Sequence, residues 1–182
     1  MVATIRTPRS RWIEAGLQAL AAGGPDAVRV EALAQTLGVT KGGFYGYFAD
    51  RNALLAEMLD AWERKATDEA IEHAERKGSD ARTRLRRAGT FTFSAGLLPI
   101  DLAVREWARH DADVAGRLRR VDNRRMAYLR ELFGEICRDE AEAEARSVLA
   151  FSLAIGHHFI AADHGPRSHE DALTLAADWL LA

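Results

Sequence analysis

Residues 30–48, VEALAQTLGVTKGGFYGYF, constrain the fold more than any other part of this chain. Val30, Leu33 and Leu37 recur at helical spacing and give the first half of the stretch one apolar face. Gly38 can adopt the left-handed conformation in which many helices end. The pattern therefore predicts a short helix followed by a tight turn.

A second helix is predicted directly after the turn. Thr40 is a suitable N-cap, and Lys41 follows it at the exposed end, where phosphates are attracted. Phe44 and the phenylalanine four residues later anchor this helix inward, whereas Tyr45 and Tyr47 lie off that stripe and can present hydroxyls to phosphates. Two helices joined in this way are typical of a helix-turn-helix, which places its second helix in the DNA major groove.

The string GVTKGGFYGYFADRNALL resembles the recognition segment of the tetracycline-repressor (TetR/AcrR-like) family, and the match is specific over residues 8–62. The resemblance implies an all-helical, homodimeric, ligand-responsive transcriptional regulator, most often a repressor, that binds a palindromic DNA operator. It also implies DNA contacts at five positions of this sequence: Thr40, Lys41, Tyr45, Tyr47 and, near the start of the next helix, Arg51.

The recognition segment departs from the family pattern at several positions. Gly46 and Tyr47 stand where the family usually carries a larger residue and often a histidine. Gly42 and Gly43 leave the helix face nearly bare, and each interior glycine costs about 1 kcal/mol relative to alanine. We therefore expect close backbone approach at these glycines and recognition through DNA shape. Arg29 occupies a place where relatives often carry Ser or Thr, and it can reach a phosphate.

The whole chain reads as helix after helix. It has 182 residues, of which 48% are hydrophobic, and strand-like alternation is absent. We expect an all-α fold in which an N-terminal three-helix helix-turn-helix domain (1–50) precedes a larger helical domain for ligand binding and dimerisation (51–182). A linking helix at about 51–76, capped by Asp50, enters the second domain.

Charge and targeting patterns restrict the partners and the compartment. The net charge of −2 argues against bulk nucleic-acid binding, although Arg6, Arg9 and Arg11 predict a basic N-terminal arm; a solvated tail is equally compatible with them. The lone Cys137 indicates a reducing compartment. The chain has neither a long apolar run nor a signal-peptide core, so we expect a cytoplasmic protein without a membrane partner.

The last two predicted helices, at 141–163 and 169–181, favour self-association. They combine small residues, which permit close helix approach, with large apolar ones, so that two subunits could form a four-helix bundle. The alternative is that these faces close the core of a monomer. The residues expected at a dimer interface are Leu149, Ser152, Gly156, Phe159 and Trp179.

The second domain also carries candidates for an effector pocket. Large aromatics and a few polar groups could surround a small apolar or aromatic molecule. The candidates are Trp62, Phe91, Asp101, Arg105, Trp107, Tyr128, His157 and His158. Ordinary core packing is the alternative for each aromatic, a solvated face for the arginine, and a satisfied core position for each histidine.

Other chemistries are disfavoured by the sequence. The histidines lack the helical i, i+4 spacing of a metal site, so no metal or cofactor is expected. Neither a nucleophile elbow nor a phosphate loop follows a strand, so we expect no enzyme. Two hypotheses remain, namely a ligand-controlled DNA-binding regulator and a helical small-molecule-binding or enzymatic domain with an incidental helix-turn-helix. The basic arm with Thr40, Lys41 and Tyr45 favours the first.

Overall fold

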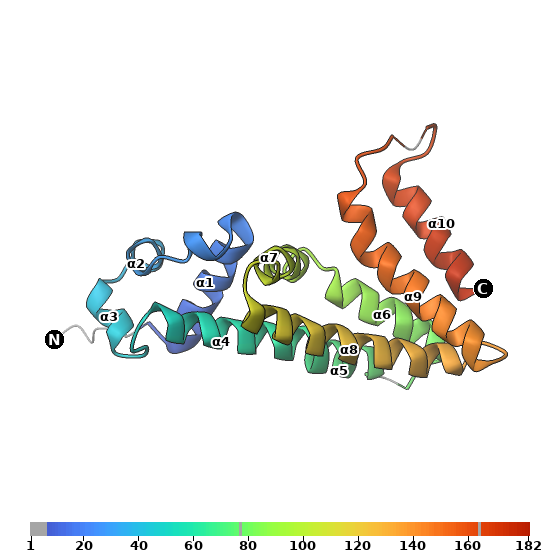
Figure 1. Cartoon of the computed structure of the whole chain (residues 1–182), viewed down its shortest axis with the longest axis horizontal. Helices are drawn as coiled ribbons and strands as arrows, with labels where there is room; N and C mark the ends of the chain where they lie inside the picture. Colours follow the sequence, from blue (N-terminus) through green and yellow to red (C-terminus); the bar gives the residue numbers. More distant parts are fainter. Residues whose placement is uncertain (1–6, 77, 164) are drawn as a thin grey trace. The chain divides into compact units, whose positions relative to one another are not determined.

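The computed structural model describes residues 7–76, 78–163 and 165–182, and this part of the chain contains helices, turns and no strand. The all-α prediction, with a helix-turn-helix region ahead of a larger helical region, is confirmed. The chain forms two compact units, and α8 (Ala112–Gly134) contributes to both of them (Figure 1).

Unit 1 contains the described residues up to Glu69 together with Ser94–Val121. Its elements are α1 (Arg9–Gly23), a 3₁₀ turn (Pro25–Ala27), α2 (Val30–Leu37), α3 (Lys41–Tyr45), α4 (Arg51–Arg64), a π-helical turn (Lys65–Glu69), α7 (Leu98–Ala108) and the first half of α8. Unit 2 contains Ala70–Phe93 and Asp122–Ala182. Its elements are α5 (Ala70–Glu75), α6 (Ala81–Thr92), the second half of α8, α9 (Glu140–Gly156), a 3₁₀ turn (His157–Phe159) and α10 (His169–Leu181).

The core of unit 1 forms where α1 packs against α2, α4 and α7. Its largest fully buried side chains include Trp12, Leu20, Phe44, Leu54, Met58, Trp62, Leu97 and Val104. Because α1 contributes to every one of these packings, it connects the helix-turn-helix to α7 within the same unit.

One turn of α4 is fixed by polar contacts to α7 and α8. The indole Nε1 of Trp62 donates to Oδ1 of Asp101 at 3.3 Å, and Nε of Arg105 donates to Oδ2 of the same carboxylate at 2.9 Å. Arg117 Nη1 lies 2.5 Å from Oδ1 of Asp60, on the exposed side of the same turn. This part of α4 is therefore held on both its buried and its exposed faces.

The predicted linking helix at 51–76 is interrupted by the π-helical turn, for two physical reasons. The residues at positions 62, 66, 70 and 74 are all buried and lie four apart. In a regular helix of 3.6 residues per turn, these three steps of four would drift by about 120° around the axis, and a wider turn absorbs most of that drift. In addition, the hydroxyl of Thr67 donates to the carbonyl of Glu63 at 2.8 Å, which competes with the regular backbone pattern.

Unit 2 is built around α5, α6, α8 and the two C-terminal helices. Its buried cluster comprises Ala74, Ala81, Leu85, Tyr128, Leu132, Phe133, Ala143 and Leu181. Arginines fix the last helix: Arg82 Nε donates to the carbonyl of Leu181 at 2.6 Å, and Arg86 Nη2 lies 2.6 Å from Oδ1 of Asp178. In Figure 1, α9 and α10 run side by side within this unit.

The compact units do not coincide with the domains predicted from the sequence. Unit 1 includes α4 and α7 in addition to the helix-turn-helix, whereas the sequence suggests a functional boundary near residue 50. The compact units are defined by contacts within the fold, whereas the predicted domains are defined by their binding surfaces, so the two divisions need not coincide. The boundary between 1–50 and 51–182 stays a prediction.

Candidate nucleic-acid interface

The turn between α2 and α3 has the geometry that the sequence predicts. Gly38 adopts φ 67° and ψ 31°, the left-handed conformation that glycine accepts without steric cost. The amides of Gly38 and Val39 donate back to the end of α2, at 3.1 Å to the Gln35 carbonyl and 2.9 Å to the Ala34 carbonyl. The predicted helix, turn and helix are thereby confirmed at these residues.

The short helix α3 is held by one aromatic anchor. Phe44 is fully buried, with its ring centroid 5.4 Å from Trp12 in an edge-on contact and 5.1 Å from Phe48 in a stacked one. Thr40 stands at the predicted N-cap, but its side chain makes no capping hydrogen bond, and only its carbonyl accepts the amide of Gly43, at 3.0 Å. Thr40 is therefore the N-cap residue, as predicted, but α3 is closed there by a backbone bond and not by the hydroxyl.

The predicted DNA-contacting residues fall into two groups by exposure. Arg29, Thr40, Lys41, Gly42 and Tyr45 are exposed, and Tyr45 has 54% of its surface accessible. Gly43, Tyr47 and Arg51 are half-buried. The first group lies on the solvent side of α2, the turn and α3, where a ligand could approach. Their role in DNA binding stays a prediction.

Two of the basic residues have intramolecular roles. Arg51 Nε donates to the carbonyl of Val28 at 2.6 Å, and its Nη2 donates to the carbonyl of Pro25, so this side chain holds the loop before α2. Arg9 Nε donates to Glu57 at 2.8 Å, and its guanidinium lies 5.0 Å from the ring centre of Phe48. Arg6 of the predicted basic arm lies outside the described residues.

Lys41 is paired with a residue that the sequence analysis did not single out. Its ammonium donates to the carboxylate of Glu31, on the first turn of α2, and the two groups form an ion pair. The hydrogen bond and the charge of Glu31 raise the pKa of Lys41, and the bond from Lys41 lowers the pKa of Glu31. The two residues are ten positions apart on different helices, so helical spacing gave no signal for the pair.

The candidates for effector binding are divided between the two units. Trp62, Asp101, Arg105 and Trp107 belong to unit 1, and Phe91, Tyr128, His157 and His158 belong to unit 2. Trp62 and Asp101 are buried and bonded to each other, which gives them a structural role whatever else they do. Trp107 and Phe91 are half-buried. A pocket formed by these residues stays a prediction.

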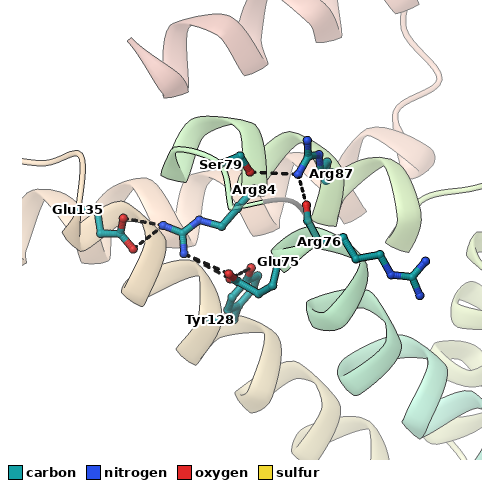
Figure 2. A network of polar contacts seen from close by, with 7 residues as sticks. All are labelled: Glu75, Arg76, Ser79, Arg84, Arg87, Tyr128 and Glu135. Carbon is teal, nitrogen blue, oxygen red and sulfur yellow. Dashed lines mark hydrogen bonds and ion pairs between the residues drawn. The ribbon is translucent and has the colours of Figure 1, made fainter.

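Tyr128 belongs to a polar network in unit 2 (Figure 2). Its hydroxyl donates to Oε1 of Glu75 at 2.6 Å, and the guanidinium of Arg84 lies between Glu75, at 3.3 Å, and Glu135, at 2.5 Å. Burial, followed by the bond to Glu75, raises the pKa of Tyr128. The network joins α5, α6 and the end of α8.

The two adjacent histidines meet a third one. Nδ1 of His157 lies 3.2 Å from Nε2 of His169, and the rings of His157 and His158 are 3.6 Å apart at their centres. Burial and the neighbouring rings lower the pKa of His157, and burial also lowers the pKa of His158. Among the described residues, no group of three or more His, Cys, Asp or Glu side chains is placed to hold a metal ion.

A cavity of about 430 Å³ lies at the turn between α8 and α9 of unit 2. Its walls are mainly charged side chains, including the ion pair between Arg130 and Glu144, and none of the predicted effector residues lines it.

The residues expected at a dimer interface are mostly accessible. Leu149 is 56% exposed, Phe159 71% and Trp179 82%; Ser152 is exposed and Gly156 half-buried. Val148, Ile160 and Leu175, on the same two helices and the turn between them, are also large apolar residues with about half of their surface accessible. A dimer formed through this surface stays a prediction.

Comparison with known proteins identifies the helix-turn-helix region. The sequence model described as "Bacterial regulatory proteins, tetR family" matches residues 13–58, which span α1 to α4. Over these residues the chain is similar to the TetR family. No similar sequence was found among curated proteins.

Solved structures share the TetR-like fold along nearly the whole chain. The TetR-family regulator PfmR from Thermus thermophilus has a TM-score of 0.67 at 18% identity, covering 94% of this chain and 97% of its own. A protein from Saccharomonospora viridis, described as a transcriptional regulator and crystallised with choline, has a TM-score of 0.74 at 18% identity, with 93% of each chain covered. AibR, crystallised with isovaleryl coenzyme A and operator DNA, has a TM-score of 0.64 at 12% identity, covering 94% of this chain and 98% of its own. No helix among the described residues is long and apolar enough to span a membrane.

Proposed function

We propose that this TetR/AcrR-like protein is a ligand-responsive transcriptional repressor that binds a palindromic operator as a homodimer. The observation that carries the proposal is the helix-turn-helix of unit 1, in which the buried Phe44 fixes α3 and leaves Lys41 and Tyr45 on its solvent side. A cation and a phenolic hydroxyl on this side are suited to contact DNA phosphates.

Dimerisation is supported by the apolar surface of α9, α10 and the turn between them. Monomeric proteins seldom leave several large apolar residues exposed on adjacent elements, because their hydration is unfavourable. A two-fold symmetric dimer would place two recognition helices on the two half-sites of a palindrome. The outcome we expect is a four-helix arrangement made by two copies of α9 and α10.

An effector is supported by the aromatic candidates of both units and by two relatives of the same fold. Those proteins were crystallised with choline and with isovaleryl coenzyme A, so the fold accommodates unlike small molecules. We propose that a small apolar or aromatic effector binds near Trp107 in unit 1 and weakens DNA binding. The proposal involves no catalytic step.

The deciding experiment measures binding of the full-length protein to a fluorescein-labelled duplex from the region upstream of its own coding sequence, with a scrambled duplex for comparison. We expect tighter binding to the upstream duplex and an affinity that falls steeply with salt. Lys41→Ala should weaken binding and reduce the salt slope by up to about one. Lys65→Ala, which removes an exposed lysine outside the helix-turn-helix, is the matched control and should bind as wild type.

Two results would contradict the proposal. One is an equal, salt-insensitive affinity for both duplexes, which would show that the protein does not recognise an operator in the upstream duplex. The other is a protein that remains monomeric in light scattering at micromolar concentration, which would refute the proposed homodimer.

A further inference from the structure

The lysine expected to contact DNA already has an anionic partner within the protein. The carboxylate of Glu31 accepts a hydrogen bond from the Lys41 ammonium, with both side chains on the solvent side of unit 1. Their side chains are 67% and 50% exposed, respectively, so both remain accessible to a ligand. Arg29, two residues before Glu31 and exposed, also interacts with this carboxylate through its charge.

Such a pair contributes little to folding. Ion pairs between exposed side chains are screened by solvent, and many make no measurable contribution to stability. The Glu31–Lys41 pair joins α2 to α3, but α3 is already fixed by the buried Phe44 and by backbone bonds across the turn. The main consequence of the pair is therefore for whatever else would bind the ammonium.

A carboxylate and a DNA phosphate present the same chemistry to Lys41. Both are anionic, accept hydrogen bonds and donate none, and both would bind the same ammonium protons. When Lys41 contacts a phosphate, Glu31 must give up its partner and then stands beside DNA as an unpaired negative charge. Both effects oppose binding.

We propose that Glu31 restrains DNA affinity by acting as an internal competitor for the phosphate contact of Lys41. The inference rests on the proposed DNA-binding function and adds a residue that sets the strength of that contact. The Glu31 carboxylate makes binding to DNA of any sequence less favourable, because the phosphate contact itself carries no sequence information. Glu31 thus lowers non-specific binding while leaving base recognition to other residues.

The expected magnitude follows from counterion release. One phosphate contact on duplex DNA contributes about −0.9 to the slope of log affinity against log salt, which is about 3.5-fold between 50 and 200 mM salt. If Glu31 suppresses that contribution, Glu31→Gln should tighten binding most at low salt. The ratio of variant to wild-type affinity should be up to about 3.5-fold larger at 50 mM than at 200 mM.

The test compares Glu31→Gln, Lys41→Ala and the double variant, each in the full-length protein, on the upstream and the scrambled duplexes. Glu14→Gln is the matched control, because it removes one exposed carboxylate from α1 of the same unit and changes the net charge equally. Anisotropy titrations at several salt concentrations give the affinities and slopes. Thermal unfolding checks that the variants remain folded.

We expect Glu31→Gln to bind both duplexes more tightly than wild type and than Glu14→Gln. We expect the gain to be clearly smaller in the Lys41→Ala background, where the variant relieves only the repulsion between the Glu31 carboxylate and DNA. An equal gain for Glu14→Gln, or a gain that is undiminished without Lys41, would overturn the inference while leaving the proposed function intact. So would wild-type binding by Lys41→Ala, since no contact would then exist for Glu31 to restrain. Absence of binding by every form, including wild type, would instead refute the proposed function, and this inference with it.

Discussion

Replacing Asp101 with alanine should destabilise the protein strongly. The carboxylate of Asp101 is fully buried in unit 1 and accepts hydrogen bonds from the Trp62 indole at 3.3 Å and from Arg105 Nε at 2.9 Å. Removing it leaves the buried indole N–H without this acceptor, and it leaves the Arg105 guanidinium, whose side chain is only 17% exposed, without this partner. Asp101 is a candidate for the effector pocket by its sequence, whereas these contacts predict a structural role.

The size of the effect follows from the two groups left behind. Removing one member of a buried ion pair costs about 3–5 kcal/mol. Because Arg105 retains some access to water, we expect the lower end, about 3 kcal/mol. For a chain of this length that corresponds to a fall of about 6–12 °C in the melting temperature. Asp101→Asn keeps an acceptor for Trp62 and should lose about half as much.

Thermal unfolding followed by far-ultraviolet circular dichroism measures these differences. Glu106→Gln is the control, since its pairs with Arg109 and His110, at 3.8 and 3.7 Å, are exposed and should contribute about 0–1 kcal/mol. The reasoning is refuted if Asp101→Ala melts within the range of this control. It also fails if Asp101→Asn is as damaging as Asp101→Ala, because the Trp62 bond would then have no separate effect.

Other predictions test the proposed surfaces. Trp179→Glu should yield monomers in light scattering that no longer bind the upstream duplex, and a dimer of unchanged mass would contradict the proposed interface. Tyr45→Phe should weaken DNA binding without lowering the melting temperature, because the residue is 54% exposed; wild-type affinity would exclude a hydroxyl contact. Trp107→Ala should leave DNA binding intact, but an effector found in a ligand screen should no longer release DNA from this variant. Normal release of DNA would place the effector site elsewhere. Lowering the pH from about 7.5 to about 5.5 should lower the melting temperature, because burial depresses the pKa of His157 and the unfolded chain then binds more protons in that range. Replacing His157 and His158 with Asn should flatten that profile, and an unchanged slope would mean that other groups titrate.

Features encoded by nearby residues were predictable from the sequence. The predicted last helix, at 169–181, has the same bounds as α10. Asp50 caps α4 by accepting the amide of Ala53 at 2.8 Å, and Gly38 ends α2 in the left-handed conformation. Each of these features depends on the chemistry of a few consecutive residues, so capping residues, helix-ending residues and apolar periodicity were enough to predict them.

Pairings between distant residues were not predictable in the same way. Trp62 and Asp101 are 39 positions apart, Arg51 at the start of α4 donates to the carbonyl of Val28 ahead of α2, and Glu31 meets Lys41 across a turn. The same side chains would look equally plausible as a pocket wall, a phosphate contact and a solvated surface. Only the packing of the helices decides among these alternatives.

The network around Arg84 has a consequence for the order in which its residues can change during evolution. Its guanidinium lies between Glu75 and Glu135, and its side chain is only 14% exposed (Figure 2). Losing the arginine first would leave two carboxylates facing each other without the cation, whereas losing Glu135 first leaves a neutral pair of Arg84 and Glu75. During evolution, substitution of one of the two glutamates should therefore precede substitution of the arginine. Among descendants of a common ancestor, positions 75, 84 and 135 should covary, and chains with both acids but no basic residue at 84 should be rare.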